Sequence, residues 1–235
     1  MNANAYLRRF IDIEYTLPEP DMEKYCSYLY QMYNFDDFFN RARRIYLPRV
    51  DEEEEFENIT LTIITSNNHL SLRTVDKIFA HSRLALRGFK AGSYSFPNIF
   101  FLLCYWKITD PEFYNNIKIH KYNLQQLIEE IESKFPSDIL SGKSDEYDGK
   151  SSSLISALGM FIYKYNINKK RHFYEKILIP KNEQSSILTF SANCNKINKT
   201  IISVSIVNCN QSSLYSNGLE NIFSRIELLN NFVSF

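Results

Sequence analysis

Apolar residues recur at intervals of three and four along most of this chain, as they do in a helix that buries one face. These stripes run over Met22–Tyr33, Leu72–Leu86, Leu124–Phe135, Leu154–Tyr165 and Leu219–Leu229. A chain of 235 residues with several such stripes can bury a sizeable core between its helices. The sequence is therefore expected to fold as a mainly α-helical protein.

Residues that start helices precede several of these stripes. Asp21 and Ser71 stand where an N-cap belongs, and Asn123 with Gln126 forms the pattern of a capping box. Pro97 suits the first turn of a further helix over the apolar run that follows it. We expect Leu72 and Met32 to lie on the inward faces of their helices.

Strand signals are few. Phe10–Tyr15 alternates apolar and acidic residues, which is typical of a half-buried strand. Ile202, Val204 and Ile206 also alternate, so a strand or small β-hairpin is expected near the C-terminus, whereas the β-branched run Ile59–Ile64 fits a strand or a helix. Because a lone strand cannot satisfy its backbone donors and acceptors, Phe10–Tyr15 needs a sheet from elsewhere.

The composition excludes several classes of function. Lys plus Arg and Asp plus Glu both number 27, and this zero balance removes the long-range attraction to phosphate that nucleic-acid binders carry. The cysteines form no C-x-x-C pair, and the histidines lack metal-ligand spacing, so free thiols and no metal site are expected. The longest apolar run, Phe96–Trp106, is shorter than the ~20 residues of a membrane span. A cytoplasmic protein without a transmembrane segment is predicted.

Two opposed charge blocks follow each other. Arg41–Arg49 contains four arginines, and Asp51–Glu55 is a run of five acids. Such blocks usually form a solvated, partly self-paired surface, which is the interpretation we favour. The arginines could instead hold a phosphate backbone together with Tyr46, but the neighbouring acids argue against it.

The most specific text in the chain is YLRRFIDIEYTLPEPD at residues 6–21, followed by LSLRTV at 70–75, KITDPEFY at 107–114 and RIELL at 225–229. These segments resemble the KAP family of P-loop NTPases, in which a strand after the Walker B region leads through a Leu-Pro turn into a helical lid. The likeness covers residues 1 to about 135, and the remainder more weakly.

The resemblance implies a division of the chain. Residues 1–20 would be the last strand and linker of a P-loop α/β core, residues 21–135 a helical lid domain, and residues 136–235 a helical and irregular extension. In fold class this is a mainly α, lid-like bundle with an N-terminal strand orphaned from its sheet.

The resemblance also gives roles to three arginines. Arg73, at the first turn of a lid helix, resembles a sensor-2 residue that touches the γ-phosphate of ATP. Arg8 or Arg9 resembles an arginine that faces nucleotide from a neighbouring subunit. A permanently charged guanidinium can stabilise charge on a transferring phosphoryl group. The alternative is that these arginines solvate helix ends or make surface pairs.

The catalytic half of such an enzyme is not encoded here. A Walker A loop needs G-x-x-x-x-G-K-[ST], whose backbone N–H groups wrap the phosphates. Gly142-Lys143-Ser144 imitates its end, but Ser137 replaces the first glycine and no apolar strand precedes it, so a polar loop is predicted. No Walker B run is present, and no G-x-S-x-G elbow marks a serine hydrolase.

These observations lead to two hypotheses. The first is the lid and regulatory part of a KAP-like NTPase, without catalytic residues of its own, which responds to ATP and Mg²⁺ held by another polypeptide and acts in phage defence. The second is a stand-alone α-helical protein-interaction module unrelated to nucleotides. A hydrolase site that no motif reveals is the weakest reading.

Overall fold

The computed structural model of this chain describes residues 20–42, 51–67, 69–89, 94–142, 150–169, 178–181, 188–211 and 219–227. The predicted strand Phe10–Tyr15, Arg8, Arg9 and most of the arginine block lie outside these residues.

The described residues are mainly helical, as the sequence predicts. The helices are α2 (Met22–Met32), α3 (Phe35–Ala42), α4 (Glu52–Thr65), α5 (Leu72–Leu86), α6 (Pro97–Thr109), α7 (Pro111–Lys118), α8 (Leu124–Lys134), α9 (Ser137–Ser141), α10 (Lys150–Lys169), α11 (Lys199–Gln211) and α12 (Leu219–Glu227). The strands β1 (Leu178–Pro180) and β2 (Leu188–Phe190) pair antiparallel. No helix in this described part of the chain is long and apolar enough to cross a membrane.

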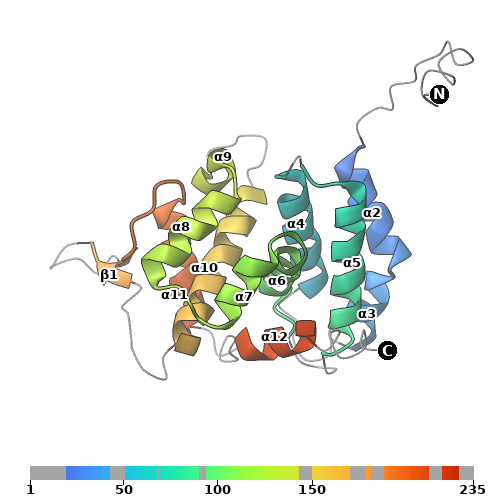
Figure 1. Ribbon diagram of the computed structural model, residues 1–235. Coiled ribbons are helices and arrows are strands. Elements are labelled where there is room, and N and C mark those ends of the chain that lie inside the picture. The colour runs from blue at the N-terminus through green and yellow to red at the C-terminus, as the bar shows by residue number, and fades with distance from the viewer. Residues whose placement is uncertain are drawn as a thin grey trace, which may run out of the picture.

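Helix α6 forms the centre of the bundle. Its residues from Pro97 to Trp106 are all buried, because all except Asn98 are apolar or aromatic and other helices cover each face. Helices α4, α5, α7, α10 and α12 pack around it (Figure 1). The Trp106 ring meets Phe113 of α7 at 4.9 Å and Phe161 of α10 at 5.2 Å between centroids. One hydrophobic cluster extends from Cys26 to Ile226, with members on both sides of residue 135.

Aromatic rings fill the contact between the first helices and this centre. Phe35 packs against Phe56 with ring centroids 4.9 Å apart, and Phe56 meets Phe101 of α6 edge-on at 5.4 Å. All three side chains are fully buried. The high aromatic content therefore serves the core in this part of the fold, where large rings bury much apolar area.

The helix caps that the sequence predicts are confirmed. The Asp21 carboxylate accepts the N–H of Lys24, and the Ser71 hydroxyl accepts the N–H of Thr74. Asn123 and Gln126 form a complete capping box at the start of α8. Each cap satisfies a backbone donor that the first helical turn leaves without a partner.

Two residues that are predicted to face inward do not. Leu72 on α5 is 39% exposed and Met32 on α2 is 51% exposed. Both lie at a helix end, where the neighbouring helix covers less of the side chain. Leu72 is the first residue of α5, and Met32 is the last residue of α2.

The predicted strand at Ile202–Ile206 is also wrong, because these residues belong to α11. Ile202 and Ile206 are buried, whereas Val204 between them is exposed. A spacing of four residues places two side chains on one helical face, so this pattern fits a helix as well as a strand. The ambiguous run Ile59–Ile64 is helical too, within α4. The antiparallel pair lies earlier, at β1 and β2, and β2 packs against α11.

Helix α12 packs onto α5 and α6 (Figure 1), and a polar cluster around Glu227 joins it to α6 and α7. Lys107 donates from Nζ to the Ile226 carbonyl at 3.0 Å, and its Nζ lies 3.7 Å from the Glu227 carboxylate. Lys118 pairs with the other carboxylate oxygen at 2.9 Å, and the Tyr114 hydroxyl donates to Glu227 at 3.1 Å. Cations beside the last turn of a helix also interact favourably with its dipole.

A buried acid, Glu132, fastens α8 to the segment before α11. Oε1 of Glu132 accepts the backbone N–H groups of Asn195, Lys196 and Ile197 at 2.8, 2.8 and 3.0 Å. The Lys196 ammonium returns a bond to the Glu132 carbonyl at 2.8 Å. Consecutive N–H groups that converge on one point form an anion-binding nest, and this nest is filled by a side chain of the same protein.

Candidate functional site

Helices α2 and α5 lie side by side and parallel, and three hydrogen bonds join them along their length. The Tyr25 hydroxyl donates to the Leu72 carbonyl at 3.3 Å, near the start of both helices. The Tyr33 hydroxyl donates to Asp76 at 2.8 Å, and Arg83 donates from Nε to the Tyr33 carbonyl at 2.9 Å. The start of α2 and the start of α5 therefore lie at the same end of the bundle.

Arg73 lies in the first turn of α5 at this end. Its side chain is exposed, and within the described part of the chain no hydrogen bond or ion pair holds the guanidinium. The Ser71 cap fixes the backbone of this turn, so the guanidinium projects from a rigid base. Arg8 and Arg9 lie outside the described residues, so Arg73 is the predicted nucleotide-sensing candidate that can be placed.

The segment that imitates the end of a Walker A loop has a different geometry. Ser137–Ser141 forms the short helix α9, with Ile139 and Leu140 buried. Gly142 ends that helix in the left-handed region, with φ of 66°. A phosphate loop precedes the helix whose N-terminus it completes, whereas Gly142 follows one. Lys143 and Ser144 lie outside the described residues, so the polar loop predicted there stays a prediction, and the helix at 137–141 does not offer a phosphate-wrapping loop.

Four acids of the run Asp51–Glu55 have structural partners, while Glu54 is exposed. Asp51 caps α4 by accepting the N–H groups of Glu53 and Glu54. Glu52 is buried, and its carboxylate accepts the backbone N–H of Ser95 at 2.8 Å and also the Ser95 hydroxyl. The prediction of a solvated surface is wrong for Glu52, because a partner distant in sequence removes it from water.

Two tyrosines bind the same run. Tyr30 donates its hydroxyl to Glu53 at 2.8 Å, and Tyr94 donates to Glu55 at 2.5 Å. Burial raises the pKa of Glu55, and the hydrogen bond from Tyr94 opposes that change. These acids therefore hold α2 and the segment before α6 against α4.

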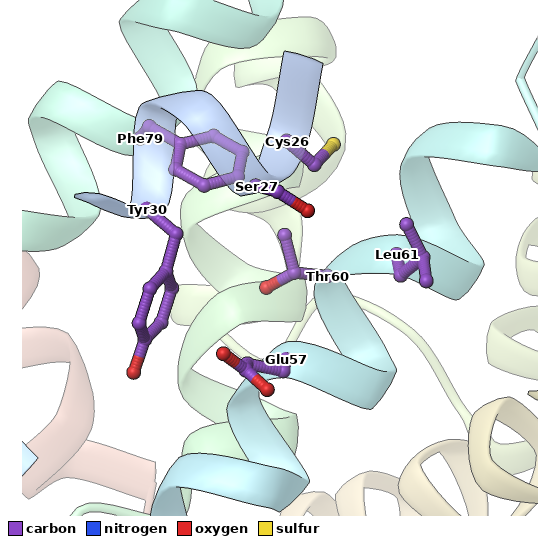
Figure 2. Close-up of a pocket in the computed structure, with 7 residues that line it drawn as sticks. All are labelled: Cys26, Ser27, Tyr30, Glu57, Thr60, Leu61 and Phe79. Atoms are coloured by element: carbon purple, nitrogen blue, oxygen red, sulfur yellow. The ribbon is translucent and has the colours of Figure 1, made fainter. Parts of the chain in front are cut away.

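A pocket of about 130 Å³ opens between α2 and α4, with α5 behind it. Its lining consists of Cys26, Ser27, Tyr30, Glu57, Thr60, Leu61 and Phe79, as Figure 2 shows. Burial raises the pKa of Cys26 to about 12, so this thiol is protonated at neutral pH and is a poor nucleophile. The pocket therefore does not present Cys26 as a reactive thiolate.

Two polar groups of the pocket have no partner in the described part of the chain. Oγ1 of Thr60 is buried and makes no hydrogen bond. The Glu57 carboxylate makes no ion pair with a described cation. Partial burial raises the pKa of Glu57, and the charges of Glu53 and Asp36 raise it further. A buried hydroxyl without a partner costs about 1–3 kcal/mol, which a bound ligand could offset.

No motif in the sequence indicates this pocket. Its lining comes from three helices, and the residue types are those of ordinary amphipathic helices. Among the described residues, no group of three or more His, Cys, Asp or Glu side chains could hold a metal ion.

The chain matches no protein-family model, and no similar chain was found among curated proteins or solved structures.

Proposed function

We propose that this chain is the helical lid and regulatory part of a KAP-like P-loop NTPase. It has no catalytic residues of its own and responds, through Arg73, to ATP and Mg²⁺ held by a core that another polypeptide supplies. A role in phage defence and a place in the cytoplasm, where ATP is available, follow from the resemblance.

The observation that carries this proposal is the position of Arg73. The chain enters the described bundle at Pro20 and Asp21, where α2 begins, and the Tyr25 bond to Leu72 brings that entry next to the start of α5. A core attached through residues 1–20 would thus adjoin the end of the bundle that carries Arg73. An exposed guanidinium at this end suits contact with a phosphate bound by that core.

The remaining segments of the resemblance support the lid as a mechanical unit. Lys107 and Tyr114 from KITDPEFY and Ile226 from RIELL form the contacts that join α12 to α6 and α7. A displacement of α5 would therefore be passed to α12, because both pack on the same central helix.

Capture from the native host tests the proposal. The full chain, carrying an affinity tag, should retain a polypeptide with a Walker A loop, and the complex should hydrolyse ATP. Arg73→Ala should lower the rate of that complex by about tenfold or more, since an arginine on the transferring phosphate contributes at least that much. Lys77→Ala removes an exposed cation one turn further along α5 and should leave the rate unchanged.

Two results would contradict the proposal. One is tight, Mg²⁺-dependent ATP binding by the isolated chain, measured by calorimetry. The other is an active complex whose rate is equal with Arg73 and with Arg73→Ala.

A second candidate function is a helical protein-interaction module unrelated to nucleotides. It is favoured by the exposure of Tyr28 (57%) and Met32 on α2, together with Leu72 on the adjacent helix. Under this alternative, Tyr28→Ala would abolish capture of the partner, and Arg73→Ala would leave every measured activity unchanged.

A further inference from the structure

We propose that the pocket between α2, α4 and α5 binds a small organic cation, namely an ammonium group on a short apolar stem. The proposal is independent of the NTPase assignment.

The first argument is the free hydroxyl of Thr60. Within α4, Thr62 donates its hydroxyl to the Asn58 carbonyl at 2.7 Å, and Thr65 donates to the Leu61 carbonyl at 2.8 Å. This bond to the carbonyl four residues earlier is the usual partner of a helical threonine. Thr60 makes no such bond, although its side chain is buried like that of Thr62. Its oxygen therefore lacks a partner within the described ranges, and because it is itself buried beside the pocket, a ligand reaches it only when the side chains that cover it move.

The second argument is the charge at Glu57. Glu57 lies three residues before Thr60, so both side chains lie on one face of α4, the face directed to α2 (Figure 2). Within the described part of the chain, the charged neighbours that act on Glu57 are carboxylates: Asp36, Asp51, Glu53 and Glu54. Such a surrounding attracts a cation and repels an anion.

The third argument is the apolar remainder of the pocket. The rings of Tyr30 and Phe79 and the side chain of Leu61 offer surface to a hydrocarbon stem. Aromatic faces also attract an ammonium group. A volume of about 130 Å³ is close to the roughly 150 Å³ of an engineered cavity that binds benzene, so an alkylammonium with three or four carbons is of suitable size.

A titration followed by NMR tests the inference on the full, ¹⁵N-labelled chain. n-Butylammonium chloride should cause saturable shifts at the amides of the lining residues on α2 and α4, in the millimolar range expected for so small a ligand. Sodium butyrate and 1-butanol share the stem but not the positive charge, and they should cause no saturable shift there.

Variants then assign the contacts. Glu57→Gln should weaken butylammonium binding by about tenfold, and Thr60→Val should weaken it several-fold. Glu54→Gln removes an exposed carboxylate of the same helix outside the pocket lining and should change the affinity much less than Glu57→Gln.

Three results would overturn the inference. They are equal binding of butanol and butylammonium, unchanged affinity in both Glu57→Gln and Thr60→Val, and shifts confined to residues away from the pocket. The unliganded spectrum of each variant establishes that it is folded, so a loss of binding can be attributed to the side chain removed.

Discussion

The Glu132 carboxylate accepts the backbone N–H of Ile197 at 3.0 Å, across 65 positions of the sequence. The same oxygen accepts two further N–H groups, so one side chain satisfies three consecutive donors. Glu132 is buried, and water cannot readily replace it.

We therefore predict that Glu132→Ala lowers the free energy of unfolding by about 2–4 kcal/mol, because it leaves buried donors without a partner. Glu132→Gln keeps an acceptor oxygen in place and should cost less. Urea unfolding followed by circular dichroism measures both. Equal losses for the two variants would show that the hydrogen bonds do not provide the stabilisation.

The lowered pKa of Glu227 predicts that the protein loses stability in acid. Burial alone would raise the pKa of Glu227, but the bond from Lys118 and the charge of Lys107 hold it below its ordinary value of 4.5. The unfolded chain thus takes up this proton at a higher pH than the folded chain. The stabilisation is complete above about pH 4.5 and is lost as the pH falls through the folded value.

Glu227→Gln should therefore destabilise the protein at pH 7, and the difference from wild type should narrow below pH 4.5. Hydrogen exchange of α12 should report the change, since Glu227 holds that helix in place. Glu220→Gln, an exposed acid of the same helix, should leave exchange unchanged. A gap between Glu227→Gln and wild type that stays constant with pH would contradict this account.

The lowered pKa of His81 predicts a second loss of stability, at a pH closer to neutral. Burial, followed by the charge of Lys107, lowers the pKa of His81 from 6.5 to about 4. Between these values the unfolded chain binds a proton that the folded chain does not, so stability falls as the pH is lowered. From pH 6.5 to pH 5 this amounts to roughly 2 kcal/mol.

His81→Met should remove this part of the pH dependence, measured as the urea midpoint at pH 7 and pH 5. His69→Gln, at an exposed position, serves as the control and should keep the wild-type slope. An unchanged slope in His81→Met would refute the assignment.

Because Thr62 has a hydrogen-bond partner and Thr60 has none among the described residues, replacing each with valine should change the stability in opposite directions. Thr60→Val removes a buried hydroxyl that has no partner, so it should stabilise the protein by about 1 kcal/mol. Thr62→Val removes a hydroxyl that donates to Asn58, and it should destabilise by a similar amount. Thermal unfolding of the two variants compares them directly, and stabilisation by both or by neither would exclude the distinction drawn between these hydroxyls.

Gly159 marks the close approach of α10 and α11. A Cβ atom at this position would lie 2.9 Å from Cβ of Ser205 and 3.3 Å from the Ile202 carbonyl oxygen. Gly159→Ala should lower stability by about 1–3 kcal/mol, although alanine favours a helix more than glycine does. Adding Ser205→Gly should restore part of the loss, and a double-mutant cycle without coupling would contradict the contact.

The helices could be predicted from the sequence where their signals are local. Asp21, Ser71 and the pair Asn123 and Gln126 cap the turns that they precede, and each cap needs only its own neighbours. The buried stripe of α12 follows the same rule, with Ile222 and Ile226 four residues apart. Local periodicity is ambiguous for Ile202–Ile206, because Ile202 and Ile206 share a face in a strand and in a helix, and only the exposure of Val204 distinguishes the two.

Features that depend on distant partners could not be predicted. Glu52 sits in a run of acids that is typical of a surface, yet Ser95, 43 positions later, provides its hydrogen bonds. The pocket could not be predicted for the same reason. Residues of α2 and α5, which are distant in sequence, enclose Thr60 and provide no partner for its hydroxyl. The predicted position of Arg73 in a first helical turn is confirmed, while its contact with a nucleotide stays a prediction.

Helix α12 also has a consequence for biosynthesis. Lys107 and Ile226 are 119 positions apart, so the surface of α5 and α6 that α12 covers has no cover until almost the whole described chain has left the ribosome. Contacts between such distant segments form late, since chain entropy opposes their closure. A nascent chain thus exposes these apolar side chains of α5 and α6 for most of translation. During this time a chaperone or a partner subunit has access to them.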